Sequence, residues 1–281
     1  ELNRDKINLN ISFYNENDLK NQSLQQNLSD EQISILNQAG DDSSLMNAPS
    51  AYQETYSENR ILYKKEIINS QEVYAYSNDP NEELYSVRFT NVGSSLGDYI
   101  LLTNNAIDNI YEYIAPINGI KQGDYNPIVK LVAPEKLQIA IINGDYIPNE
   151  KTNVTFEIAS SKNDKNLFST IDDNNNDGIA AKISTSNQLI KNKLWEIYAK
   201  ANLDYIDKDF QSIEMIYNPE FNRDWNLDSL TSYSYINQVK NQLLIQGGIN
   251  LINKKIGKIN YNYENLKFEK EYTGIRQQLD L

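Results

Sequence analysis

The sequence predicts a mainly β protein. Along several segments apolar and polar residues alternate, as they do when successive side chains of a strand point to opposite faces. The clearest example is residues 195–205, where every second residue is apolar and most residues between them are polar or charged. Tyrosine is also abundant, with 20 residues against 7 Phe and 2 Trp. Its amphipathic ring suits strands that are wet on one side and the aromatic girdles of membrane barrels.

The N-terminal region predicts one strand followed by one helix. Apolar residues occupy alternate positions within residues 6–14, which favours a strand. A short helix is expected near residues 30–38. Ser29 is a suitable N-cap, Gln32 completes a capping box, and Gly40 is a suitable stop. Such a short helix must dock on other structure to persist.

The next region predicts short strands and turns. Residues 60–68, 72–77 and 84–92 are typical of strands separated by turn residues. The tripeptide Gly-Asp-Tyr then occurs three times at unequal spacings, at 97–99, 123–125 and 144–146. Because glycine permits tight turns and aspartate can bond its own backbone, we interpret these tripeptides as three similar turns.

After residue 135 the alternating segments become longer and the turns shorter. Several approach the roughly 9–11 residues that a tilted transmembrane strand requires. We therefore predict a soluble, β-sandwich-like domain with one short helix over residues 1–133. Residues 134–281 are predicted to form a long antiparallel β-meander of the outer-membrane barrel type. We expect this meander to be incomplete at its C-terminus, within a longer protein. A soluble sandwich or jelly roll would show the same alternation, so that alternative remains open.

Composition excludes several functional classes. The net charge of −13 opposes binding to nucleic acid. The absence of Cys and His removes disulfides, thiol chemistry and the commonest general base. A glycoside hydrolase could still be built from carboxylates such as Glu157, Glu196 and Glu220, but no spacing selects a pair. We therefore expect a protein that is not an enzyme.

One loop predicts a calcium site. Residues 173–178 match the front of a calcium-binding loop, with oxygen ligands expected from Asp173, Asn175 and Asp177 before a glycine. The match then ends, because position 12 of the loop is Ser184 and not a bidentate glutamate. The alternative interpretation is a solvated hairpin loop that carries polar residues.

A second group of residues predicts a binding site. Glu220, Arg223, Asp224 and Trp225 form the densest cluster of charged and aromatic residues. Trp225 could stack on a sugar or peptide while the charged groups form hydrogen bonds. The structural alternative is an Arg–carboxylate pair that fixes a loop or faces a barrel lumen.

Six motifs are distributed over most of the chain: 16–22, 28–32, 97–99, 119–125, 160–169 and 220–225. They resemble motifs of large, poorly characterised envelope proteins of the Bacteroidota, and the Asn-, Lys- and Tyr-rich composition is similar to that of flavobacterial proteins. The resemblance implies an outer-membrane or surface-exposed β protein longer than this chain. It implies no catalytic residues.

The leading functional hypothesis is a non-enzymatic segment of a bacterial outer-membrane or cell-surface protein. Such a segment would contact membrane lipid and present loops or dock partner subunits of an envelope complex. The first alternative is a secreted β-sandwich module that binds glycans, with calcium as a possible cofactor. The second is a glycoside hydrolase that uses a carboxylate pair roughly 5–10 Å apart.

Overall fold

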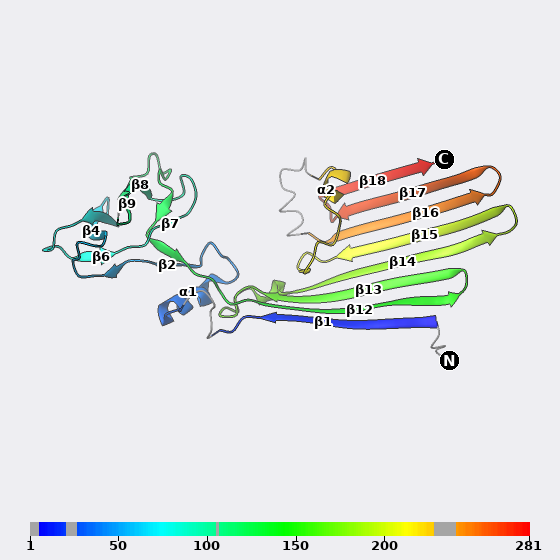
Figure 1. The fold of residues 1–281 in the computed structure, drawn as a ribbon, viewed down its shortest axis with the longest axis horizontal. Coiled ribbons are helices and arrows are strands. Elements are labelled where there is room, and N and C mark those ends of the chain that lie inside the picture. The colour runs from blue at the N-terminus through cyan, green and yellow to red at the C-terminus, as the bar shows by residue number, and fades with distance from the viewer. Residues whose placement is uncertain (1–5, 21–26, 105–106, 228–239) are drawn as a thin grey trace. The chain divides into compact units, whose positions relative to one another are not determined.

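The computed structural model describes residues 6–20, 27–104, 107–227 and 240–281 (Figure 1). Its elements are mainly antiparallel strands, with two α-helices in the described ranges, which confirms the mainly β part of the predicted fold class. The last two residues of the motif at 16–22 lie outside these ranges. The chain divides into two compact units. The sheet unit comprises Glu1–Leu19, Pro134–Leu167 and Asp172–Leu281, and the inserted unit comprises Lys20–Ala133 and Phe168–Ile171.

One eight-stranded antiparallel sheet forms most of the sheet unit, in the order β1-β12-β13-β14-β15-β16-β17-β18 (Figure 1). Each strand after β12 pairs with the strand that precedes it, so the sheet is a meander. The strands are β1 (Ile7–Asn17), β12 (Lys136–Asn149), β13 (Thr152–Asp164), β14 (Asp177–Lys191), β15 (Trp195–Ile206), β16 (Gln242–Asn253), β17 (Gly257–Phe268) and β18 (Tyr272–Asp280).

The sheet is open along both outer strands. The described residues show no pairing between β1 and β18, so no barrel is closed. The residues predicted as the long alternating segment, 195–205, lie in β15 and pair on one side with β14 and on the other with β16.

The N-terminal strand belongs to the sheet unit. The predicted division placed it in a domain of residues 1–133, whereas Ile11 of β1 pairs with Ile142 of β12 and Asn17 pairs with Lys136. The chain thus leaves the sheet after β1 and returns to it at β12. The boundary near residue 134 coincides with that return, and the residues between the two strands form the inserted unit.

The inserted unit contains two four-stranded sheets and one two-stranded sheet. The sheet orders are β3-β6-β4-β5, β7-β10-β8-β9 and β11-β2. The strands are β2 (Asn47–Pro49), β3 (Tyr52–Gln53), β4 (Leu62–Ile68), β5 (Gln71–Ser77), β6 (Leu84–Ser86), β7 (Thr90–Asn91), β8 (Tyr99–Asn104), β9 (Asn109–Tyr113), β10 (Tyr125–Asn126) and β11 (Ile128–Lys130).

Buried aromatic residues join the two four-stranded sheets. Phe89 lies between Tyr63 of one sheet and Tyr99 of the other, with ring centroids 5.1 and 4.8 Å away. The Tyr99 hydroxyl accepts a hydrogen bond from the Tyr74 amide at 2.8 Å, and the Tyr63 hydroxyl accepts one from the Tyr111 amide at 3.1 Å. Each sheet therefore supplies a buried hydroxyl to the backbone of the other. Burial raises the pKa of both tyrosines to about 12.

Two of the Gly-Asp-Tyr tripeptides pair with each other. Gly97 and Gly123 exchange backbone hydrogen bonds of 2.8 and 3.0 Å, and Tyr99 pairs with Tyr125. A side chain on either glycine would meet the backbone of the other tripeptide's tyrosine, so glycine is required for this close approach. The third tripeptide was also interpreted as a turn, but Gly144 lies inside β12, where it pairs with Leu9 of β1.

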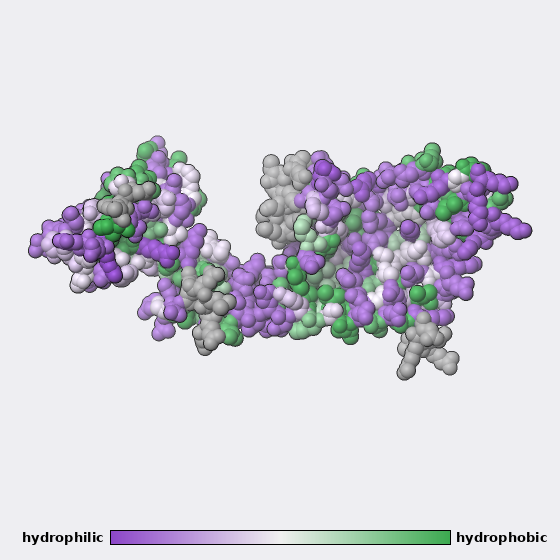
Figure 2. Space-filling view, viewed as in Figure 1, coloured by the Kyte–Doolittle hydropathy of each residue, from purple (hydrophilic) through white to green (hydrophobic). Residues whose placement is uncertain are grey.

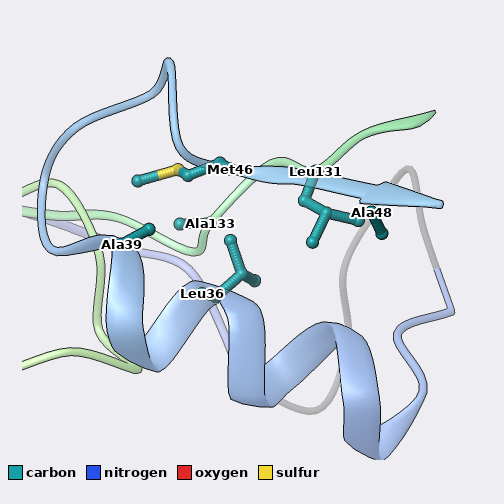
Figure 3. Packing of buried hydrophobic residues seen from close by; sticks show 6 residues of the cluster. All are labelled: Leu36, Ala39, Met46, Ala48, Leu131 and Ala133. Atoms are coloured by element: carbon teal, nitrogen blue, oxygen red, sulfur yellow. The ribbon is translucent and has the colours of Figure 1, made fainter. Parts of the chain in front are cut away.

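The helix α1 (Asp30–Ala39) forms as predicted. Ser29 is its N-cap, and the reciprocal hydrogen bonds of Ser29 and Gln32 form the expected capping box. Gly40 follows the helix with a positive φ of 61°. One face of the helix packs on neighbouring segments of the inserted unit (Figure 3). The buried cluster consists of Leu36, Ala39, Met46, Ala48, Leu131 and Ala133.

Candidate functional site

The two faces of the eight-stranded sheet differ in chemistry, because the registers align polar residues on one face and apolar residues on the other. We call these the polar face and the apolar face. Figure 2 shows hydrophilic side chains over much of the visible side of this unit, with smaller hydrophobic groups among them. The two faces are described separately below, since each supports a different interaction.

The polar face carries a row of hydrogen bonds that crosses five strands. Ser184 Oγ donates to Asn202 Oδ1 at 2.5 Å, and Asn202 Nδ2 donates to Gln246 Oε1 at 2.9 Å. Gln246 Nε2 then donates to Glu264 Oε1 at 2.6 Å. The same carboxylate accepts from Arg276 Nε at 2.5 Å. This row holds the polar side chains of β14 to β18 in fixed orientations.

A hydrophilic groove of about 480 Å³ lies beside this row. Gly248 forms part of its lining, and the lack of a side chain there makes room for that of its cross-strand neighbour Asn262, whose Oδ1 lies 2.8 Å from where a Cβ would stand. Other lining residues are Asn153, Thr155, Lys182 and Ser186. The groove offers hydroxyl, amide, ammonium and carboxylate groups, the last from Glu264. Tyr263 also lines it, from a position on the apolar face of β17.

Residues 207–227, which we call the cover segment, fold back over one end of the polar face. This segment contains α2 (Phe221–Asp224). Its Trp225 and Leu227 join a buried cluster with Leu244, Leu266 and Phe268 of the sheet. Hydrogen bonds that involve side chains attach the segment to strands β13, β16 and β18: Gln211 N donates to Ser161 Oγ at 2.9 Å, Gln242 Nε2 to Tyr217 Oη at 2.8 Å, and Tyr272 Oη to Trp225 O at 2.6 Å.

Two glycines of the sheet allow this close contact. A side chain at Gly178 would meet the backbone of Phe210, and one at Gly274 would come within 2.9 Å of the Trp225 ring. Both glycines lie on the polar face, in β14 and β18. They accommodate the cover segment where any side chain would force it away from the sheet.

A pocket of about 640 Å³ lies between the cover segment and the sheet. The apolar part of its lining includes Ile139, Ala159 and Ala180 from the sheet, and Phe210 and Ile213 from the cover segment. Asp204 of β15 also lines the pocket, although only 8% of its surface is exposed. Its Oδ1 atom has no hydrogen-bond partner among the described residues.

The predicted binding cluster lies within the cover segment. Arg223 Nη2 and Glu220 Oε2 form an exposed ion pair at 2.6 Å. Asp224 Oδ2 lies 3.6 Å from Arg276 Nη1 of β18. The Trp225 ring is 6% exposed, and the Arg276 guanidinium lies over it at 5.2 Å from the centroid. The structure thus brings the four residues together, but the indole packs inside the protein and carries a cation on its face.

The predicted calcium loop is compact. Asp173 and Asn175 lie in the 3₁₀-helix η2 (Asp173–Asn175), and Asp177 begins β14. The buried Asn176 donates from Nδ2 to Asp173 Oδ1 at 3.2 Å. In the described part of the chain, no group of three or more acidic residues is placed to hold a metal ion. Calcium binding therefore stays a prediction from the sequence.

The carboxylates considered for glycoside hydrolysis lie in different settings. Glu157 lines the pocket on the polar face. Glu196 forms an ion pair of 3.6 Å with Lys254 near the opposite end of the sheet, and Glu220 pairs with Arg223. Glu196 and Glu220 are thus each paired with a nearby cationic side chain.

The apolar face is exposed on all eight strands. One large apolar side chain from each strand illustrates it: Ile11, Ile142, Ile158, Ile183, Leu203, Ile245, Tyr261 and Ile275. Their exposed fractions range from 38% for Leu203 to 78% for Ile11. The predicted residues Trp195 and Leu203 belong to this face, with Trp195 39% exposed. In the described residues no second sheet is paired or packed in the sheet unit.

Comparison with known proteins finds no matching family model, no matching characterised protein and no matching solved structure. Across the described ranges, no helix has both the length and the apolar character needed to cross a membrane. Sequence reasoning missed Asp204 and the cover segment as parts of a site. The adjacent pair Leu243-Leu244 was an available signal, because consecutive apolar residues in a strand indicate that both faces are apolar there.

Proposed function

We propose that the sheet unit is a section of the wall of a bacterial outer-membrane protein, with its apolar face against lipid and its polar face toward water. The observation that carries this proposal is the exposed apolar row on every strand of the sheet. Eight strands at about 4.8 Å spacing make this surface roughly 35 Å wide. Monomeric soluble proteins rarely expose apolar patches of that extent, because such patches drive association.

The backbone geometry supports the same proposal. In hydrocarbon every backbone N–H and C=O must be satisfied within the protein, and the inner strands of a continuous ladder meet that requirement. The eight strands contain 9 to 15 residues each. A tilted strand needs about 9–11 residues to cross a bilayer. The free edges of β1 and β18 would need partners in such a wall, supplied by closure or by further strands.

The connections at the two ends of the sheet differ in length. Residues 150–151, 192–194 and 254–256 form short turns at one end. The other end carries the long connections 165–176 and 207–241, together with one short turn, 269–271. The chain also leaves for the inserted unit at the long-loop end, after β1. Outer-membrane barrels have short periplasmic turns and longer extracellular loops. The long connections and the inserted unit are accordingly the parts presented outside the cell.

The proposed role is non-enzymatic: presentation of these segments, or docking of partner proteins of an envelope complex. The motif resemblance to Bacteroidota envelope proteins supports this location and suggests that the partners are other envelope proteins. Membrane lipid is the second partner, because it would cover the apolar face.

Neighbouring residues on opposite faces provide the test. The chain contains no cysteine, so single cysteines can be introduced and labelled with the fluorophore NBD. We expect NBD at Ile183→Cys to emit at shorter wavelength in lipid vesicles and to be quenched by lipids that carry a spin label in their acyl chains. NBD at Ser184→Cys, on the polar face, should show neither effect, since adjacent side chains point to opposite faces.

The two labels share strand, depth and chemistry, so Ser184→Cys is the control for Ile183→Cys. Similar quenching at both positions, or at neither position in a chain that has bound to the vesicles, would count against a lipid-facing surface. A chain that stays monomeric in water without lipid or detergent would also contradict the proposal.

A further inference from the structure

A second cross-strand row lies beside the hydrogen-bonded row of the polar face, and its side chains are not bonded to one another. This open row consists of successive ladder partners in β13 to β17: Asn153, Ser186, Lys200, Gly248 and Asn262. All of them line the groove of about 480 Å³. Within the described part of the chain, the side chains of Asn153, Ser186, Lys200 and Asn262 form no hydrogen bond or ion pair.

Lys200 is the cation of the open row, and its neighbours on the polar face are uncharged. Tyr198 and Asn202 flank it on the same face of β15. The positions around it on the adjoining strands are Ser184, Ser186 and Gln188 of β14 and Gln246, Gly248 and Asn250 of β16. The ammonium group thus has three hydrogen atoms to donate and no carboxylate beside it to accept them.

The other charged groups of the groove have counter-charges outside it. Glu264 is paired with Arg276 of β18 at 2.5 Å. Lys182 is the ladder partner of both Glu157 and Asp204, and neither of these acids lines the groove. The ammonium group of the open row therefore leaves one positive charge in the groove without a nearby counter-charge.

The uncharged lining suits a hydroxylated ligand. Hydroxyl and carboxamide groups both donate and accept hydrogen bonds, as sugar hydroxyls do. Asn153, Ser186 and Asn262 offer such groups, and the groove volume is within the range typical of small-molecule sites. Tyr263 belongs to the apolar face, so the lining residues on the polar face provide no ring on which an aromatic ligand would stack.

We infer that the groove binds an acidic sugar, with its carboxylate on Lys200 and its hydroxyls on the other side chains of the open row. A charge-assisted hydrogen bond is stronger than a neutral one, so the acid group sets the preference. The groove lies on the polar face, and binding there needs no contact between the apolar face and lipid. Failure of the lipid-facing proposal therefore leaves this inference standing, and the reverse also holds.

Three methyl glycosides that differ only in the group at carbon 6 test the inference with the full chain. They are methyl glucuronide with a carboxylate, methyl glucoside with a hydroxyl, and methyl 6-amino-6-deoxyglucoside with an ammonium group. Binding is followed by broadening of the NMR signal of the shared O-methyl group. We expect the glucuronide to bind about fivefold more tightly than the glucoside, and the amino sugar to bind most weakly.

Equal affinities for the glucuronide and the glucoside would overturn the inference, as would the absence of binding by all three probes. All titrations use the same neutral detergent, so that its effect on the probes cancels between variants.

Substitutions then assign the preference to Lys200. Lys200→Gln removes the charge and should reduce the preference for the glucuronide to within about twofold of the glucoside. Lys200→Arg keeps the charge and should keep the preference. Lys258→Gln is the matched control, because Lys258 is a lysine of the same face that does not line the groove. An unchanged preference in folded Lys200→Gln, or an equal loss in Lys258→Gln, would overturn the inference.

A second variant keeps the inference testable if Lys200→Gln does not fold. Ser186→Ala removes a hydroxyl of the open row next to Lys200. It should weaken binding of the glucuronide and of the glucoside about threefold each, since both sugars lose the same neutral hydrogen bond. Unchanged affinity for both sugars in Ser186→Ala would contradict a ligand that lies along the open row.

Discussion

In the inserted unit, two tyrosine hydroxyls connect the four-stranded sheets by hydrogen bonds. The hydroxyls of Tyr63 and Tyr99 accept hydrogen bonds from backbone amides in the opposite sheet, and both rings are 2% exposed. Burial disfavours the phenolate and raises the pKa of each tyrosine to about 12. The neutral hydroxyls are therefore part of what holds these two sheets together.

This linkage predicts alkaline unfolding of the inserted unit. The unfolded tyrosine pKa is about 10, so the stabilisation is fully present below pH 10 and is lost as the pH rises from about 10 to 12. Tyrosine ionisation can be followed by absorbance at 295 nm. We expect a fraction of the tyrosines, the late fraction, to ionise only above pH 10, and this ionisation to coincide with loss of near-ultraviolet circular dichroism. Tyr63→Phe should shrink that fraction and lower stability at pH 7 by about 1 kcal/mol.

Tyr56→Phe is the matched control, because Tyr56 is 39% exposed. It should leave both the late fraction and the stability unchanged. Ionisation of every tyrosine near pH 10 with the near-ultraviolet signal intact would contradict the proposed link.

Residues whose role depends on near neighbours could be predicted from the sequence. Ser29 and Gln32 form the expected capping box because both partners lie within one helical turn. Asp204 could be placed on the polar row of β15 by alternation. Its burial could not be predicted, because the residues that cover it come from the cover segment and from strands distant in sequence.

At the scale of elements, the position of the cover segment depends on two glycines of the sheet. Gly178 and Gly274 permit contacts with Phe210 and Trp225 that alanine would obstruct. The sequence revealed the strands because their alternation is periodic. It did not reveal the cover segment, because a long irregular connection has no period, and its position is set by contacts with several strands at once.

We expect Gly178→Ala to loosen the cover segment. The added methyl group would meet the backbone of residues 209–210, and overpacking of this kind costs about 1–3 kcal/mol. In a Trp195→Phe background Trp225 is the sole tryptophan, so its fluorescence reports on the segment directly. The emission should shift to longer wavelength as the indole becomes exposed.

Gly247→Ala provides the comparison, because an added Cβ there would come no closer than 3.9 Å to its neighbours. It should leave the Trp225 emission unchanged. An unshifted spectrum in Gly178→Ala would show that this glycine does not control the position of the segment.

At the scale of the whole molecule, the inserted unit interrupts one hairpin of the sheet. Asn17 and Lys136 are direct partners, and the Asp18 amide donates to Glu135 O at 2.9 Å. The sequence predicted the boundary near residue 134 because strand length changes there. It did not predict that β1 belongs to the later strands, since strand pairing across such a separation leaves no local pattern.

Replacement of residues 19–134 by Asn-Gly should therefore preserve the sheet. A two-residue turn would join the paired ends Asp18 and Glu135 as in an ordinary hairpin. We expect the shortened chain to keep its β-type circular dichroism in lipid, together with strong quenching of NBD at Ile183→Cys.

Removal of one further residue is the control. Replacement of residues 19–135 by the same turn would pair Asp18 with Lys136, which shifts β1 by one residue and turns its apolar row to the other face. That variant should lose the pairing of β1. Equal behaviour of the two deletions would show that β1 pairing does not determine the fold of the sheet.

The pairing of β1 with β12 also has a consequence for the order of events during synthesis. β1 leaves the ribosome before β12, its ladder partner, which follows only after residues 18–135 have emerged. Closing a flexible chain of that length carries an entropic cost that delays contact between its ends. Once residues 20–133 have collapsed into their own sheets, the tether becomes short. The pairing of β1 thus waits for the unit that is synthesised between it and β12.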